Sequence, residues 1–95
     1  MYKRQAKEDV ALVVDAGVAA EDVRQALADG AGDLLESVRL FDRYAGEQVG
    51  PGKVSLAFAL RLRAPDRTLS GAEVAEIRER ALTEATARCG AVLRT

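Results

Sequence analysis

The sequence predicts an α+β fold in which a four-stranded antiparallel sheet carries two helices on one face. Three observations predict it. A chain of 95 residues is long enough for one domain with one core. Apolar side chains alternate strictly with small or charged ones over 54–62, which is typical of a strand with one buried face. Two segments, 19–31 and 70–89, contain good helix formers with apolar residues along one side.

The first strand is expected over 10–14, where β-branched residues are dense, and turn residues follow at 15–17. We interpret residues 1–8 as a domain boundary or an expression remnant. The chain is therefore expected to be a single domain whose ordered part spans about 9–94.

The first helix is expected over 19–31, without a Ser or Thr residue to cap its start. Two glycines, Gly30 and Gly32, are expected to end it. A second strand is expected over 34–44. The glycine-rich segment 46–52 then forms a hairpin loop that leads into the third strand.

The second helix begins with a strong local pattern. Ser70 and Glu73 form the S-x-x-E sequence of a capping box, and Gly90 stands where a glycine commonly ends a helix. Cys89 lies on the apolar side of this helix, so we interpret it as a packing residue rather than a reactive thiol. A short terminal strand is expected over 91–94.

This order of elements, βαββαβ, is that of a ferredoxin-like sandwich. In that topology the first and third strands are central, and the second and fourth form the edges. The apolar positions of the central strands then point toward the helices. The opposite, open face of the sheet receives the residues of the other parity, which are Ala11, Val13, Ser55, Ala57 and Arg61.

The residue types limit what this open face can do. The chain has no His, no Asn and one Cys. This excludes zinc sites of His and Cys, the Arg–Asn pair of acyl-phosphate hydrolases and the paired cysteines of copper chaperones. The outward positions of the central strands are not the aromatic residues on which RNA recognition motifs stack bases. We expect no catalytic residue and no metal ligand in this chain.

The charge is distributed unevenly, although the formal net charge is only −1. Residues 8–36 hold eight acidic side chains and one basic side chain, whereas residues 39–67 hold six basic and three acidic ones. Two interpretations stay open: a solvated surface of both signs, or a middle segment that contacts an anion such as phosphate. The single thiol and the lack of a long apolar run favour a cytoplasmic domain with no membrane partner.

Three runs of residues carry a resemblance to a known family. They are E-S-V-x-L-F-D-x-Y at 36–44, K-x-S-L-A-F at 53–58 and P-D-R-T-L at 65–69. Over 9–94 the chain resembles the C-terminal ferredoxin-fold anticodon-binding domain of the bacterial phenylalanyl-tRNA synthetase beta chain. It departs from that family at Glu8, where an Arg usually precedes the Asp, and at Arg43, where an apolar residue is frequent.

The resemblance implies recognition of the anticodon stem-loop of phenylalanine tRNA on the open sheet face. The residues implied to surround the first anticodon base are Ala11, Asp42, Tyr44, Ser55 and Arg94. It also implies that the remainder of the synthetase beta chain and its alpha subunit are partners. ATP and magnesium would serve the parent ligase, with no cofactor in this domain, so the chain would be a noncatalytic fragment. A stand-alone ferredoxin-like protein-interaction or regulatory module remains the alternative.

The parity of the strands supports part of this site independently. Ala11 and Ser55 have the outward parity of the central strands, and Arg94 has the opposite parity to the apolar Leu93. Asp42 and Tyr44 conflict with this pattern, because they share the parity of residues that belong in the core. A β-bulge at 41–42 would turn both side chains outward, and we predict one there.

Overall fold

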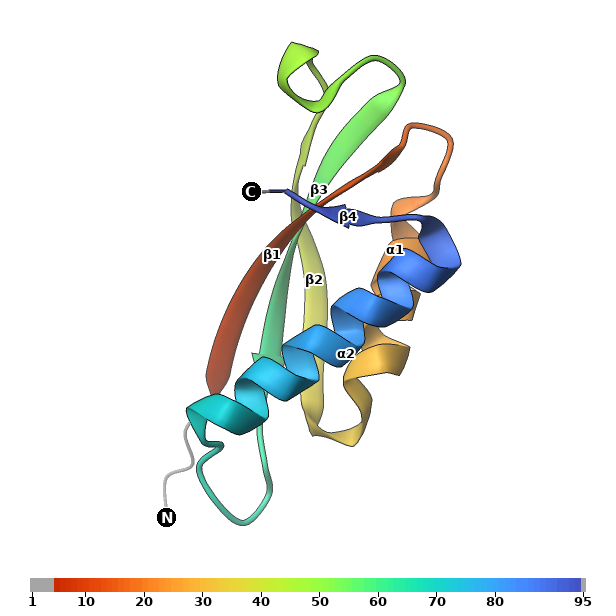
Figure 1. The fold of residues 1–95 in the computed structure, drawn as a ribbon. Coiled ribbons are helices and arrows are strands. Elements are labelled where there is room, and N and C mark those ends of the chain that lie inside the picture. Colours follow the sequence, from red (N-terminus) through yellow and green to blue (C-terminus); the bar gives the residue numbers. More distant parts are fainter. Residues whose placement is uncertain (1–4, 95) are drawn as a thin grey trace.

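The computed structural model describes residues 5–94, and both helices lie on the same side of the sheet (Figure 1). The strands are β1 (Ala6–Asp15), β2 (Leu35–Tyr44), β3 (Lys53–Leu62) and β4 (Val92–Leu93), and the α-helices are α1 (Ala20–Ala31) and α2 (Gly71–Cys89). Two short 3-10 helices, η1 (Gly32–Leu34) and η2 (Glu47–Val49), precede and follow β2. The predicted ferredoxin-like α+β fold is confirmed. Neither helix in residues 5–94 is long and apolar enough to cross a membrane.

The sheet is antiparallel with the strand order β2-β3-β1-β4, so the two central strands are the expected ones. β1 begins at Ala6, earlier than the start at Val10 that the pattern predicted. Its charged first residues carry no strand pattern, but they pair with the end of β3, where Ala6 lies opposite Leu62. Residues 6–8 therefore belong to the sheet, although the ordered part was expected to begin near residue 9. The expectation for residues 1–4 lies outside the described residues.

The core lies between the helices and one face of β1 and β3. Phe58 is completely buried at the middle of β3. The apolar residues packed around it include Val10, Leu12, Val14, Leu27, Leu56, Leu60, Leu62, Ile77, Ala81 and Ala85. This assignment of faces agrees with the alternation in the sequence. The opposite face of the sheet, turned away from both helices, is the open face (Figure 1).

The ends of α2 are as the sequence predicted. The Ser70 hydroxyl accepts a hydrogen bond from the Glu73 backbone N–H at 3.1 Å. The Ser70 backbone N–H donates to Glu73 Oε1, also at 3.1 Å. Gly90 ends the helix in the left-handed conformation with φ of 69°, which a glycine adopts at little cost.

Gly30 was expected to end α1, but the helix continues to Ala31. Gly30 instead serves the packing of α1 against α2. A Cβ atom at Gly30 would lie 2.5 Å from the Arg80 carbonyl oxygen and 2.8 Å from Ala81 Cα in α2. The missing side chain is therefore what lets the two helices approach each other. Gly32, with φ of 80°, is the glycine that follows the helix end.

Candidate functional site

A β-bulge in β2 determines which of its side chains reach the open face. Leu40 lies opposite Phe58, whereas Asp42 lies opposite Ala57, the next residue back along β3. Phe41 is therefore an extra residue without a partner, and the predicted bulge at 41–42 is confirmed. Beyond it, the parity of β2 is reversed, so Asp42 and Tyr44 face outward.

The five residues implied by the resemblance lie in two neighbouring rows across the open face. Residues directly opposite one another in a sheet point to the same side. Row 1 consists of Tyr44, Ser55, Val13 and Val92. Row 2 consists of Asp42, Ala57 and Ala11, and Arg94 joins it because its backbone N–H donates to the Ala11 carbonyl at 2.8 Å. The terminal strand β4 itself is limited to Val92–Leu93, shorter than the expected 91–94.

Tyr44 and Arg94 come from opposite edges of the sheet and meet above it. The guanidinium carbon of Arg94 lies 5.3 Å from the centroid of the Tyr44 ring, within cation–π range. Strands β3 and β1 lie between the edge strands, so the pair spans the small residues of rows 1 and 2. Ser55 has the expected outward parity, yet it is only 4% exposed. No helix covers this face, so we infer that side chains of the open face itself bury Ser55.

The Asp42 carboxylate accepts one hydrogen bond from a neighbouring residue and has a second oxygen that can accept others. Its Oδ1 atom accepts a hydrogen bond from the Arg43 backbone N–H at 3.0 Å. Among residues 5–94, no other group donates to the Asp42 carboxylate. The side chain is exposed, so its second oxygen faces solvent above row 2 and can accept hydrogen bonds from a ligand.

Two further residues of the hairpin loop support the site and were not predicted from the sequence. Gln48 in η2 accepts a hydrogen bond through Oε1 from Arg94 Nη2 at 3.3 Å. A Cβ atom at Gly46 would lie 2.7 Å from the Tyr44 hydroxyl oxygen. The backbone of Gly46 is extended, so space rather than conformation explains the glycine. Only the fold brings these loop residues to the open face.

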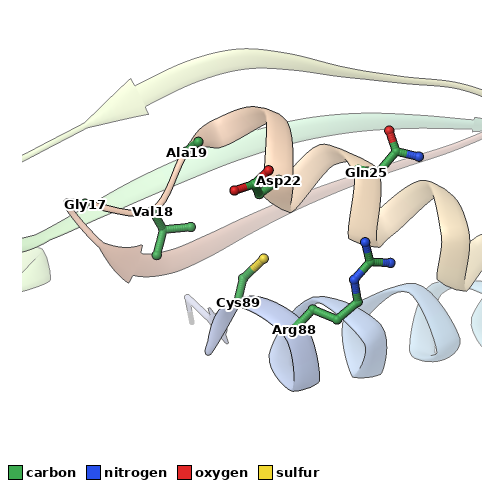
Figure 2. A pocket seen from close by; sticks show the side chains of 7 residues that line it. All are labelled: Gly17, Val18, Ala19, Asp22, Gln25, Arg88 and Cys89. Carbon is green, nitrogen blue, oxygen red and sulfur yellow. The ribbon is translucent and has the colours of Figure 1, made fainter.

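A separate hollow lies between the start of α1 and the end of α2 (Figure 2). Figure 2 shows Arg88 and Cys89 pointing from α2 toward α1. Arg88 is ion-paired with Asp29 at 2.6 Å and with Glu84 at 3.4 Å, and its hydrogen bond holds the pKa of Asp29 below the ordinary value. Within residues 5–94 no cluster of His, Cys, Asp or Glu could hold a metal ion. The polar groups gathered in rows 1 and 2 make the open face the better candidate site.

Comparison with known families decides what kind of domain this is. The family model of the ferredoxin-fold anticodon binding domain matches residues 3–94. The chain belongs to this family. The motifs at 36–44, 53–58 and 65–69 had indicated the same family, which is therefore confirmed. Rows 1 and 2 lie on the open sheet face of an anticodon-binding domain.

Individual relatives of this anticodon-binding domain agree with the family match. The chain is 64% identical over 90 residues to the phenylalanine–tRNA ligase beta subunit of Cutibacterium acnes. It is 62% identical to the beta subunit of Thermobifida fusca and 57% identical to that of Streptomyces avermitilis. These alignments cover 94–95% of this chain but only 11% of each relative. The chain spans about a tenth of the length of the relatives it matches.

Proposed function

We propose that this domain reads the first anticodon base of phenylalanine tRNA on its open face. The observation that carries the proposal is the meeting of Ala11, Asp42, Tyr44, Ser55 and Arg94 in two neighbouring rows. Ala11 and Ala57 form a flat floor on which a base can lie close to the backbone. Asp42 accepts hydrogen bonds from the Watson–Crick edge of guanine, and Tyr44 supplies an aromatic surface for stacking.

Arg94 moves when the base binds. Stacked rings have centroids about 4.5–7 Å apart, so no base fits between the Tyr44 ring and a guanidinium that lies 5.3 Å from it. The base takes the place of Arg94 against Tyr44, in the row that contains Ser55. The released guanidinium then contacts a phosphate or the outer face of the base.

The domain acts as a noncatalytic part of a phenylalanine–tRNA ligase beta subunit in the cytoplasm. Its partners are the anticodon stem-loop, the remainder of the beta subunit and the alpha subunit. ATP and magnesium take part in aminoacylation elsewhere in that enzyme. The 64% identity to one such beta subunit supports this assignment.

The proposal is tested by a chemical-shift titration of the chain with an anticodon stem-loop of phenylalanine tRNA. We expect the largest shifts at Ala11, Ser55 and Arg94, and weaker binding when the first anticodon base is replaced. Shifts confined to α1 and α2, or no shifts, would contradict the proposal and favour a protein-interaction module.

Asp42→Asn separates base reading from a purely structural function of Asp42. The asparagine oxygen still accepts the hydrogen bond from the Arg43 N–H, but an amide donor replaces the second acceptor oxygen. We expect the loop with guanine to bind about 1–3 kcal/mol more weakly, the range for one good base-edge contact. The preference for guanine should fall with it. An unchanged preference would rule out base reading by Asp42.

A further inference from the structure

The open face continues beyond rows 1 and 2 toward the start of β1. Row 3 consists of Arg39, Ala59 and Asp9, and row 4 consists of Ser37, Arg61 and Lys7. Residues advance about 3.3 Å each along a strand, so same-face rows are about 7 Å apart. Arg39 thus lies about 7 Å from row 2, and Lys7 and Arg61 lie about 14 Å from it.

The cations of rows 3 and 4 are incompletely neutralised within the chain. Within residues 5–94, neither Lys7 nor Arg39 forms an ion pair. Arg61 reaches one carboxylate, that of Asp9, at 3.6 Å. Lys7 and Arg61 also lie directly opposite each other, an arrangement of like charges that destabilises a sheet. An external anion would relieve this repulsion.

The same two rows contain no large apolar side chain. Ala59, at the centre of row 3, is 5% exposed. The other members of the two rows are Ser37 and charged residues. A protein interface would need an apolar or aromatic anchor here. The three cations of rows 3 and 4, which lie on a flat surface without large apolar side chains, instead suit a flexible polyanion.

We propose that Lys7, Arg39 and Arg61 form a phosphate track, which binds the phosphodiester backbone of the nucleotides next to the base held at rows 1 and 2. This inference rests on the proposed function, because the base at rows 1 and 2 determines where the RNA strand begins on this face. The strand runs along β1 and β3 from row 2 to row 4. Phosphate contacts position the strand and carry no sequence information.

The test compares Arg39→Gln with Arg43→Gln as a matched control. Both arginines are exposed residues of β2 without an ion pair within residues 5–94, but Arg43 lies opposite Leu56 and faces the helix side. Binding of the phenylalanine anticodon stem-loop is measured between about 50 and 200 mM salt, where phosphate contacts dominate the salt dependence. A thermal melt confirms that both variants are folded.

We expect Arg39→Gln to weaken binding several-fold at the lowest salt. The slope of log K against log salt should become shallower by about 0.7, the contribution of one phosphate on a single strand. The loss should be equal for loops with guanine and with a substituted first base. The double variant Lys7→Gln, Arg61→Gln should reduce the slope further, and Arg43→Gln should leave it unchanged.

Equal slopes and affinities for Arg39→Gln and Arg43→Gln would overturn the phosphate track. The proposed function fails in a different way, when the wild-type chain shows no preference for guanine at the first anticodon base. A slope reduced by Arg39→Gln without such a preference would support the track and contradict base reading. Absence of any binding by the wild-type chain would overturn both.

Discussion

At the scale of single residues, Tyr44 offers the site a ring and a hydroxyl. The ring faces Arg94, and the hydroxyl lies next to Gly46. If the ring carries the function, Tyr44→Phe should bind the anticodon stem-loop nearly as well as the wild type. Tyr44→Leu should lose about 1–3 kcal/mol, the contribution of stacking one base on an aromatic side chain. Fluorescence anisotropy of a labelled stem-loop measures both. Equal losses in the two variants would instead assign the function to the hydroxyl.

Replacing Gly30 by alanine would have two opposite effects on stability, a gain in helix propensity and a loss in the packing of α1 on α2. Alanine is favoured over glycine in a helix by about 1 kcal/mol, but a Cβ at Gly30 would meet the α2 backbone at 2.5 Å. We expect Gly30→Ala to destabilise the fold by about 1–3 kcal/mol, as overpacking commonly does. Gly71→Ala is the matched control, because nothing lies within 4 Å of its Cβ position at the start of α2. Urea unfolding of both variants checks this. A Gly30→Ala variant as stable as Gly71→Ala would contradict the close approach of the helices.

At the scale of elements, the bulge at Phe41 can be tested with two deletions of equal length. Deleting Phe41 removes the extra residue but leaves Asp42 opposite Ala57 and Tyr44 opposite Ser55. Deleting Arg43 places Tyr44 on the parity of the helix side. We expect the variant without Phe41 to retain most of its stem-loop binding. The variant without Arg43 should lose about 1–3 kcal/mol of binding free energy, because the Tyr44 ring no longer faces the open side of the sheet. Titration of both with the same stem-loop measures this, and the reverse order of affinities would refute the assigned register.

The start of α2 should be sensitive to acid through Glu73. The hydrogen bond from the Ser70 backbone N–H, and then the Arg67 guanidinium, hold the pKa of Glu73 below its ordinary value of 4.5. A lowered pKa in the folded state means that the stabilisation is present above pH 4.5 and is lost as the pH falls through the folded-state pKa.

We therefore expect the melting temperature of the wild type to fall more between pH 5 and pH 2 than that of Glu73→Gln. Glutamine keeps an acceptor for the capping box but does not titrate. At neutral pH the wild type should be the more stable of the two, because glutamine cannot pair with Arg67. Parallel pH dependences would show that Glu73 contributes nothing to acid sensitivity.

At the scale of the whole molecule, one small core supports both the helices and the sheet. Phe58 is its largest fully buried side chain. We expect Phe58→Ala to cost about 3–5 kcal/mol, which approaches the total stability of a small domain. Phe41→Ala is the control, since Phe41 is 49% exposed at the bulge, and it should cost less than about 1 kcal/mol. Chemical denaturation of the two variants measures the difference, and similar costs would mean that the faces of β3 are assigned incorrectly.

The uneven charge along the chain is only partly reproduced on the folded surface. Arg39 and Arg61 of the basic middle segment lie in rows 3 and 4, on the open face. Lys53 and Arg67, from the same segment, are paired with Asp15 and Glu73. A count along the sequence left open a solvated surface of both signs or an anion-binding segment, whereas the fold divides that segment between a charged face and local ion pairs.

The sequence by itself determined the order of elements, the buried face of β3, the capping box at Ser70 and the family. Each depends on a local pattern: alternation along one strand, a spacing of three residues at a helix start, or a run of matching residues. The bulge at Phe41 was also predictable. Val38 and Asp42 have the same parity, yet Val38 belongs in the core and Asp42 on the open face, so the parity had to change between them.

Other features were decided only by the tertiary structure. The start of β1 at Ala6 depends on pairing with β3, because the charged residues there have no strand pattern. The contact between Tyr44 and Arg94 joins the two edges of the sheet and depends on the register of all four strands. The packing of Gly30 on α2 and the grouping of Lys7, Arg39 and Arg61 on the open face also depend on how the elements are aligned. A local pattern tells which way a side chain points from its own strand or helix, whereas its neighbours on the next element are determined by how the elements are aligned.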